Sequence, residues 1–418
     1  MADLTVELYG TIVGELVGTS PRTFDFRSAS TALETFGLGS TVLSEAVPFD
    51  VVPNRGRAAH RRNFFTELLP EDNLRTYLAR QAGLSEADTI GLLSHYGRDV
   101  AGALQVWDPD NPGEPRTPFA NPIDDDTIAD LLRDARTYPL GNSVETGKSL
   151  INGVQTKIVL VREDDRWKRP EDGFPSTHIL KPRLDDTSTI VFDEEYGSRL
   201  ARLLGLATHA TWIDRFDDVD TLVVERYDRS ASSPDGRIHQ EDMNQVLGAS
   251  GPEKYQKLGG RVSSRRIAHV LRTVTDADSL LRFARLTVLA AAVGDLDLHA
   301  KNVSLLHPFE APRSLAPAYD VVPMAHLDND HEMALAVNGV YSHAAITIDD
   351  LISETEGWGL RDARAVVLDS VAEIRSLARV EAPLAGSWSG LQEDIASFTE
   401  NLLAGRAIGG SRQFGAGA

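Results

Sequence analysis

The N-terminal part of the chain alternates between apolar and polar residues before helical spacing takes over. Leu4, Val6 and Leu8 face one way, and this period-two pattern predicts a half-buried strand. Helical spacing follows over residues 74–82 and 89–94. These patterns predict a β-rich N-terminal region that also contains helices.

A proline-rich segment and a short helix precede a second group of predicted strands. Residues 107–122 contain five prolines and several Asp, which predicts a loop, and residues 126–136 are predicted to form a short helix. Apolar and β-branched runs bounded by turn residues then predict strands over 157–161, 178–180 and 221–225.

The chain is predicted to be largely helical after about Asp242. Residues 278–293 give the strongest helix, which is apolar nearly all round and therefore expected to be buried, with Ser279 as its cap. This order predicts an α+β fold with two lobes, the first rich in strands and the second mostly helical. The expected divisions are an N-terminal subdomain (1–138), a small lobe (139–242), a helical C-terminal lobe (243–404) and a flexible tail (405–418).

Composition places the chain among ordinary globular proteins. Hydrophobic residues make up 42% and charged residues 25%, and the absence of cysteine excludes disulfides, thiolate metal sites and cysteine nucleophiles. The sequence begins without the pattern of a secretory signal, and no apolar run reaches the roughly 20 residues of a membrane span. We therefore expect a cytoplasmic protein with no membrane partner.

The net charge bears on nucleic-acid binding. A formal charge of −20 disfavours tight direct binding of DNA by most of the surface. The basic run at 55–62 is predicted to be a solvated loop, with an auxiliary DNA contact in a partner's complex as the alternative.

Chemistry-bearing side chains gather directly after the predicted buried helix. The segment 294–304 contains two acids, a His, a Lys and an Asn, and it leads into an apolar run that predicts a strand at 303–306. Phosphoryl transfer needs a carboxylate to orient the acceptor hydroxyl, and an Asn and an Asp to hold magnesium. Asp297, Asn302 and Asp320 are the candidates for these roles, although a polar turn with capping Asp would look similar.

A lysine on the phosphates is the fourth requirement of this chemistry. Lys181 ends an apolar strand at 177–182 and can supply it, the alternative being a solvated lysine at a strand end. A lysine strand, then Asp-x-x-x-x-Asn, then an Asp within an apolar run is the order found in protein kinases.

With these motifs in order, the chain resembles the HipA family of toxin kinases across nearly its full length. The segments that carry the resemblance are Phe64-Phe65, Leu68–Glu71, Leu74-Arg75, Gly97–Gln105, Gly153–Lys157, Thr177–Pro182, Val224–Arg229, His239–Met243, Asp297–Asn302 and Tyr319-Asp320. The resemblance implies a protein-kinase-like (phosphatidylinositol-kinase-like) fold with an extra N-terminal subdomain. It also implies ATP, Mg²⁺, a serine/threonine protein substrate, and a small HipB-like helix-turn-helix antitoxin through which alone DNA is contacted.

The resemblance also implies roles for individual residues. Asp297 is similar to the catalytic base, Lys181 to the phosphate-binding lysine, and Asn302 and Asp320 to the metal ligands. The remaining nucleotide-site residues that it implies are Ile151, Asn152, Gly153, Val154, Gln155, Lys157, Glu225, Arg226, Tyr227, His299 and Lys301.

Regulation and one ion pair are less well defined by the resemblance. HipA-type kinases often carry a regulatory serine at the position that is Leu150 here, so Ser149 is a shifted candidate for autophosphorylation. Glu195 is a candidate partner of Lys181, and the adjacent Glu194 is the alternative.

Other readings of these motifs give different functions. Thr146–Ser149 suggests a P-loop, but the first glycine and the preceding strand of that motif are missing. Asp295, Asp297 and His299 would share one face of a strand, as in a metal-dependent hydrolase, while His326 and His331 are predicted to lie in a solvated connection. A small-molecule kinase and an inactive co-repressor are the alternatives within the resemblance.

Overall fold

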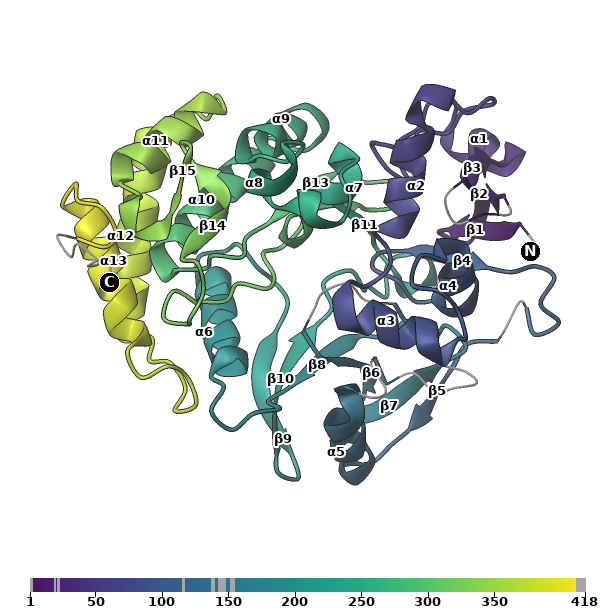
Figure 1. The fold of residues 1–418 in the computed structure, drawn as a ribbon, viewed down its shortest axis with the longest axis horizontal. Helices are drawn as coiled ribbons and strands as arrows, with labels where there is room; N and C mark the ends of the chain where they lie inside the picture. The colour runs from purple at the N-terminus through teal and green to yellow at the C-terminus, as the bar shows by residue number, and fades with distance from the viewer. Residues whose placement is uncertain are drawn as a thin grey trace. The chain divides into compact units, whose positions relative to one another are not determined.

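The structure is a computed structural model, and it describes residues 3–18, 20, 23–114, 117–136, 140–141, 148–150 and 155–410. The chain forms two compact units, whose elements are labelled in Figure 1. The first unit comprises Met1–Asp186, Trp212–Gly251 and Ser304–Pro312, and the second comprises Thr187–Thr211, Pro252–Val303 and Arg313–Ala418. The boundaries expected after residues 138, 242 and 404 stay predictions.

The first unit begins with an antiparallel sheet in the order β3-β2-β1-β4. Its strands are β1 (Leu4–Leu8), β2 (Thr11–Val17), β3 (Asp25–Ser28) and β4 (Leu104–Trp107). Leu4, Val6 and Leu8 are buried, which confirms the predicted strand, but Thr5 between them is buried as well, so the strand is more than half-buried. In the register, Leu4 faces Leu16 and Val6 faces Val106, so apolar residues pair across the strands.

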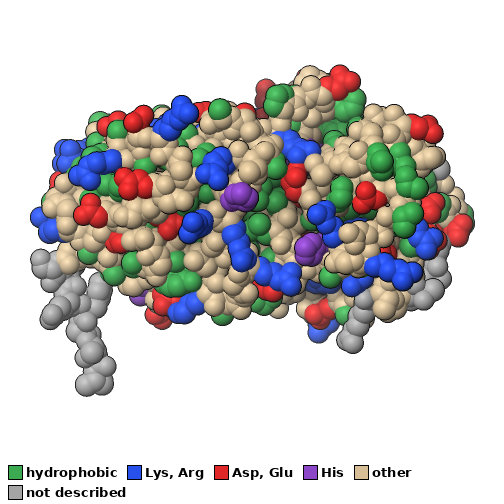
Figure 2. All heavy atoms as spheres, turned by 90° about the horizontal axis from the view of Figure 1, so that it is seen from above, with side chains coloured by type: hydrophobic (Ala, Val, Ile, Leu, Met, Phe, Trp, Pro, Cys, Tyr) green, Lys and Arg blue, Asp and Glu red, His purple; other side chains and the backbone are tan. Residues whose placement is uncertain are grey.

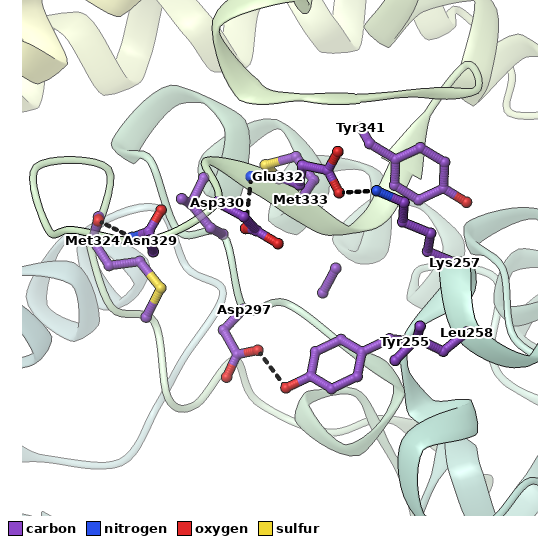
Figure 3. Close-up of a pocket in the computed structure, with 12 residues that line it drawn as sticks. Tyr255, Lys257, Leu258, Asp297, Met324, Asn329, Asp330, Glu332, Met333 and Tyr341 are labelled. Atoms are coloured by element: carbon purple, nitrogen blue, oxygen red, sulfur yellow. Dashed lines mark hydrogen bonds and ion pairs between the residues drawn. The ribbon is translucent and has the colours of Figure 1, made fainter. Parts of the chain in front are cut away.

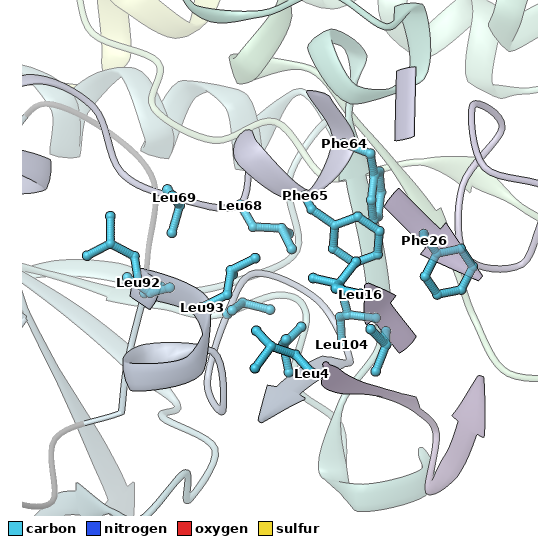
Figure 4. Close-up of a cluster of buried hydrophobic side chains, with 14 of the residues drawn as sticks. Leu4, Leu16, Phe26, Phe64, Phe65, Leu68, Leu69, Leu92, Leu93 and Leu104 are labelled. Atoms are coloured by element: carbon cyan, nitrogen blue, oxygen red, sulfur yellow. The ribbon is translucent and has the colours of Figure 1, made fainter. Parts of the chain in front are cut away.

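Four helices accompany this sheet and bury a common core. They are α1 (Ser30–Phe36), α2 (Ala58–Thr66), α3 (Asp72–Gln81) and α4 (Thr89–Tyr96), of which α3 and α4 confirm the predicted helical spacing. Figure 4 shows Phe65 of α2 beside the strand residues Leu16 and Phe26, and the rings of Phe26 and Phe65 lie 5.5 Å apart. Each such side chain, once buried, contributes about 1.5–3 kcal/mol to folding.

The basic run at 55–62 is not the solvated loop that its charge predicted. It forms a 3-10 turn (Arg55–Arg57) and the start of α2, and the Arg61 side chain is buried. Arg61 Nε donates to Asp25 Oδ1 over 2.6 Å. Phe64 and Phe65 anchor the helix in the core, and this places Arg61 where an acidic partner from β3 satisfies it.

A six-stranded sheet follows in the order β5-β7-β6-β8-β10-β9. Its strands are β5 (Phe119–Pro122), β6 (Ile158–Glu163), β7 (Arg166–Glu171), β8 (His178–Pro182), β9 (Thr211–Phe216) and β10 (Val219–Glu225). The helix α5 (Asp125–Arg133) packs against it through Ile128, Ala129 and Leu132. The predicted helix and three strands are confirmed, but the predicted loop is wrong at its end, because the proline-containing β5 forms the sheet's edge.

A further strand pair completes the first unit. β11 (His239–Asp242) pairs antiparallel with β12 (Ser304–His307), which confirms the strand predicted after the polar segment. Asp242 accepts a bond from the backbone N–H of Gln245, whose side chain accepts from Asp242 N–H, and this capping box begins α7 (Met243–Leu247).

The second unit is mainly helical, as predicted for the later part of the chain. Its elements include α6 (Ile190–Leu203), α8 (Gln256–Gly259), α9 (Ser264–Val274), α10 (Ser279–Val293), β13 (Ser314–Leu315), β14 (Glu332–Val337), β15 (Val340–Ser342), α11 (Ile348–Gly357), α12 (Ala363–Val380) and α13 (Leu391–Leu403). α10 is buried and contacts α12 and α13, as its apolar surface predicted. Among the described residues, no helix is long and apolar enough to cross a membrane.

The start of α10 corrects the predicted cap. Ser279 lies within the helix, and its backbone N–H and its hydroxyl both donate to Asp276 Oδ1, over 2.9 and 2.6 Å. The acidic side chain three residues upstream therefore takes the capping role predicted for Ser279.

Charged side chains of both signs are mixed on the face drawn in Figure 2. Lys and Arg lie among Asp and Glu there, although acids outnumber bases by 62 to 42 in the whole chain. The field of this face therefore arises from close opposite charges, which salt screens within about 10 Å.

Acidification is expected to destabilise the first unit through His178. Its ring lies between Trp167 and Trp212, at centroid distances of 5.3 and 5.7 Å. Burial lowers the pKa of His178 to about 4 from 6.5, although Glu225 opposes the shift. Since the unfolded chain then binds more protons between these values, the free energy of unfolding falls as the pH drops from about 6.5 to about 4.

Urea unfolding at pH 7.0 and 4.5 measures this effect. Wild type should lose about 2–3 kcal/mol more than His178→Gln over that range. An equal loss in both proteins would show that another group controls the acid response.

Candidate active site

The polar segment begins where a glycine ends α10. Gly294 has a φ of +74°, and a Cβ at this position would lie 2.7 Å from the Ala325 side chain. Glycine is therefore required both by the left-handed turn and by the close neighbour. Met324 N–H donates to Gly294 O over 2.9 Å, which joins this turn to the segment that follows Asp320.

Backbone and side-chain hydrogen bonds hold the segment 295–302 in one compact loop. Asp297 N–H donates to Asp295 Oδ1 over 3.2 Å, and Asn302 Nδ2 donates to Asp297 O over 3.0 Å. An Asn amide that donates through nitrogen still has its oxygen to offer as an acceptor. The loop is not a strand, so Asp295, Asp297 and His299 do not share a strand face as the hydrolase alternative required.

The Asp297 carboxylate lies at the surface of this loop within reach of two rings. Its side chain is 42% exposed, and Tyr255 Oη donates to Asp297 Oδ1 over 3.3 Å, as Figure 3 shows. His299 Nε2 lies 3.9 Å from Asp297 Oδ2, and the Tyr255 and His299 rings meet edge to face at 5.4 Å. Tyr255 has no kinase motif around it, so the sequence offered no signal for this contact.

Asp320 occupies an unusual backbone conformation next to the same loop. Its φ is +57°, in the left-handed region that residues other than glycine seldom adopt. Tyr319 Oη donates to Lys301 O over 2.7 Å, which ties this segment to the loop that carries Asp297 and Asn302. Backbone strain of this kind is common at functional sites.

Acidic groups of the second unit lie close enough to influence the buried Asp295. Burial raises the pKa of Asp295 well above its usual range, and Asp297, Asp320 and Glu194 raise it further. In the described ranges, no three His, Asp or Glu side chains converge as a metal site of their own. Magnesium commonly uses one or two protein groups together with phosphates and water, so the oxygens of Asn302 and Asp320 fit that ion.

The first unit carries the predicted phosphate-binding residues. Lys181 is buried on β8 opposite Leu222, Lys157 is buried directly before β6, and Gln155 is half-buried. Residues 151–154, which are Ile151, Asn152, Gly153 and Val154, lie outside the described residues. Lys148 Nζ donates to His95 O over 2.8 Å, so this lysine of the P-loop-like run is engaged with the backbone near α4.

The predicted hinge begins at Glu225, the last residue of β10, and continues through Arg226 and Tyr227. Arg226 N–H donates to Thr177 O over 2.9 Å, and Tyr227 Oη donates to the Gln240 side chain. Arg226 points its guanidinium inward, where it contacts Asp228 at 2.8 Å and Ser176 Oγ at 2.7 Å.

The segment of the predicted hinge belongs to a buried ionic network centred on Asp99. Asp99 is fully buried and lies 2.8 Å from Arg229 and 3.6 Å from Arg226. Burial alone would raise the pKa of Asp99, but these arginines outweigh it and hold the pKa below its usual value. Asp99 also accepts a hydrogen bond from Ser176 Oγ over 2.7 Å. The network joins the segment after α4 to the hinge.

Ser149 contributes its hydroxyl to this network. It is 4% exposed, and its Oγ donates to Asp99 Oδ2 over 3.1 Å. Leu150 N–H donates to Asp99 O over 2.8 Å, which fixes the same segment. Autophosphorylation of Ser149 stays a prediction, and it would require this buried hydrogen bond to break, since a phosphate would meet the Asp99 carboxylate.

Two features of α6 were not resolved by sequence. Glu195 lies 3.1 Å from Arg199 and 4.0 Å from Arg202, and its pairing with Lys181, with Glu194 as the alternative, stays a prediction. The connection at 326 is not simply solvated: His326 Nε2 lies 3.4 Å from Asp193 Oδ2 and stacks on Trp388.

The fold and these residues define a kinase-like protein: a β-rich N-terminal part, a lysine-bearing strand, and a helical region with the Asp, Asn and Asp motifs. The model of the HipA N-terminal domain matches residues 4–107, and that of the HipA-like C-terminal domain matches residues 149–378, more than half of the chain. The chain belongs to the HipA family, which confirms the resemblance seen in its motifs.

Several relatives and one solved structure agree with this assignment. Y4mE of Sinorhizobium fredii, named as a predicted kinase, is 33% identical over 79% of this chain and 81% of its own. The serine/threonine-protein kinase toxin HipA of Shewanella oneidensis is 27% identical over 85% and 84%. A chain in the structure of the Shewanella oneidensis HipA, HipB and operator DNA complex shares the fold, with a TM-score of 0.77, 24% identity and 96% coverage of both chains. Membership in this kinase family implies the use of ATP in general.

The Tyr255 contact gives a testable role to a residue outside the kinase motifs. Tyr255→Phe should lower the rate of phosphoryl transfer about tenfold, because the exposed Asp297 carboxylate loses the hydrogen bond that orients it. The KM for ATP should stay unchanged. Steady-state kinetics over a range of pH would check this, and an unchanged rate and pH profile would assign the contact to packing alone.

Proposed function

We propose that this chain is a toxin serine/threonine protein kinase that transfers the γ-phosphate of ATP to a hydroxyl of a cellular protein. The observation that carries the proposal is the loop arrangement in the second unit. There, Asn302 is hydrogen-bonded to the backbone of Asp297, and the Tyr319–Lys301 bond ties in the segment of Asp320. These groups supply a base and two oxygen donors for Mg²⁺.

Each residue has a defined task in the proposed reaction. Asp297 takes the proton of the acceptor hydroxyl. The hydroxyl oxygen bonds to the γ-phosphorus of ATP as the bond from that phosphorus to ADP breaks. Asn302 and Asp320 would hold Mg²⁺, which would neutralise charge on the phosphates. By resemblance to the family, Lys181 is proposed to bind the phosphates, Gln155 and Lys157 to lie over them, and residues 225–227 to face the adenine. His299 and Lys301 line the catalytic loop.

The proposed partner is a small HipB-like helix-turn-helix antitoxin. The Shewanella oneidensis relative is named as a toxin, and the solved complex contains HipA, HipB and operator DNA. A chain with a net charge of −20 would then reach DNA through its antitoxin, whose binding neutralises the kinase. The proposed outcome of free activity is growth arrest through phosphorylation of a translation component in the cytoplasm.

Two alternatives lead to different products. A small-molecule kinase would use the same phosphate chemistry, and an inactive co-repressor would act through its antitoxin alone. The presence of Lys181, Asp297, Asn302 and Asp320 together favours an active enzyme over the co-repressor.

A lysate assay with γ-labelled ATP and Mg²⁺ should yield a labelled protein band with wild type. Lys181→Ala and Asp320→Ala should lose that band while keeping the wild-type circular dichroism spectrum, because each removes a group from the phosphates or the metal. A labelled metabolite would support the small-molecule kinase, and no label at all would support the co-repressor. A full rate in either variant at saturating ATP would remove that residue from the site.

A further inference from the structure

A cavity of about 550 Å³ lies within the second unit beside Asp297. Figure 3 shows Asp297 and Tyr255 on one side of it, with Glu332, Met333 and Tyr341 across from them. Its apolar lining consists of Leu258, Leu296, Met324, Met333, Ala334 and the rings of Tyr255 and Tyr341. A cavity of this size is in the range of ligand-binding sites, and thioether side chains adapt to different occupants.

The charges around the cavity favour a protein segment over a nucleotide. Of the described residues that line it, Asp297, Asp330 and Glu332 contribute three carboxylates, and Lys257 contributes one ammonium group. Lys257 is paired with Glu332, and Asp330 is exposed. A triphosphate would be repelled by this excess of negative charge, whereas a segment with a basic residue would be attracted.

We propose that this cavity holds the apolar side chain next to the acceptor hydroxyl of the protein substrate, with a basic residue of that substrate at Asp330. The proposal rests on the proposed kinase function, because Asp297 lines the cavity and would receive the hydroxyl's proton. An apolar side chain in contact with Met324 and Met333 would leave the water at the same time as the neighbouring hydroxyl reaches Asp297.

One lining residue supports an occupant of this kind. Leu258 of α8 is 66% exposed, yet it borders the cavity. An exposed apolar side chain next to an apolar cavity continues the surface on which a substrate segment could lie. Leu203, at the end of α6, is 47% exposed and does not line the cavity, so it provides a matched control.

A peptide series tests the selectivity of the full-length chain. Each peptide carries one serine, with Leu, Met, Ala or Asp on either side of it and with or without a flanking Arg, and γ-labelled ATP with Mg²⁺ is the donor. A peptide with Leu or Met beside the serine should have a kcat/KM about tenfold or more above that of the peptide with Ala. This is the usual effect on kcat/KM of methylene groups missing from an apolar pocket. The flanking Arg should add about two- to fivefold.

Two variant pairs connect the selectivity to the cavity. Leu258→Ser should reduce the preference for Leu severalfold, while Leu203→Ser should leave it unchanged. Asp330→Arg should abolish the gain from the flanking Arg, while Asp328→Arg, at an exposed acid outside the lining, should retain it. None of the four should change the KM for ATP.

The outcomes separate this inference from the proposed function. Equal kcat/KM for all peptides, or unchanged selectivity in Leu258→Ser and Asp330→Arg, would overturn the subsite while leaving the kinase intact. Labelling of lysate proteins without labelling of any peptide would also overturn it. Failure to label proteins and peptides alike would overturn the kinase function and the subsite together.

Discussion

Asp297→Asn is expected to reduce phosphoryl transfer by about 10²–10⁴-fold, the usual contribution of a positioned general base. The substitution keeps the size of the side chain and its acceptor oxygen, so the Tyr255 hydrogen bond can persist. It removes the negative charge that is proposed to take the hydroxyl proton. ATP binding should stay near wild type, because Lys181, Asn302 and Asp320 are proposed to hold the nucleotide and metal.

Single-turnover kinetics with labelled ATP, together with nucleotide binding measured by calorimetry, check this prediction. Asp328→Asn is the control, since it removes an exposed acid from a nearby loop and should transfer at the wild-type rate. In a host without the antitoxin, wild type should arrest growth and Asp297→Asn should not. Equal arrest by both at equal expression would mean that toxicity does not arise from kinase chemistry.

Asp99→Ala should lower the free energy of unfolding by about 3–5 kcal/mol, because it leaves buried arginines without their carboxylate. Arg229 lies 2.8 Å from Asp99, and both side chains are at most 6% exposed. The change also removes the acceptor of the Ser149 and Ser176 hydroxyls. The segment at 148–150 should therefore become more accessible.

Urea unfolding gives the stability, and hydrogen exchange at residues 148–150 gives the local effect. Asp130→Ala is the matched control, because its ion pair with Arg133 is exposed and worth at most about 1 kcal/mol. If Asp99→Ala were no less stable than Asp130→Ala, the network would not hold the hinge and the Ser149 segment together.

The spacing of apolar residues predicted the elements that have a regular apolar pattern along the chain. The sequence of β1 alternates apolar and polar residues, and α10 is apolar nearly all round, so both were recognisable. Contacts with residues distant in the sequence explain the elements that the spacing did not predict. Arg61 is buried because Asp25 meets it, and β5 is a strand because β7 pairs with it. Neither partner is visible in the local sequence.

The motifs of the candidate site could be recognised from the sequence, because kinase chemistry requires particular residue types in a particular order along the chain. The structure brings Asp297, Asn302 and the segment of Asp320 together in the second unit through hydrogen bonds. Tyr255 lies 42 residues from Asp297, and Asp193 lies far from His326 in the sequence, so their contacts depend on the fold. Ser149 was placed by its distance from a glycine, whereas its burial against Asp99 required the structure.

The most direct test of the account is to identify the atom that receives the phosphate. Purified wild-type chain would be incubated with γ-labelled ATP, Mg²⁺ and a cell lysate, and the labelled product would be analysed by phosphoamino-acid separation and mass spectrometry, with Asp297→Asn in parallel. The account predicts phosphoserine or phosphothreonine on a discrete protein with wild type, and almost none with the variant. Label on a metabolite, or equal protein labelling by both chains, would contradict it.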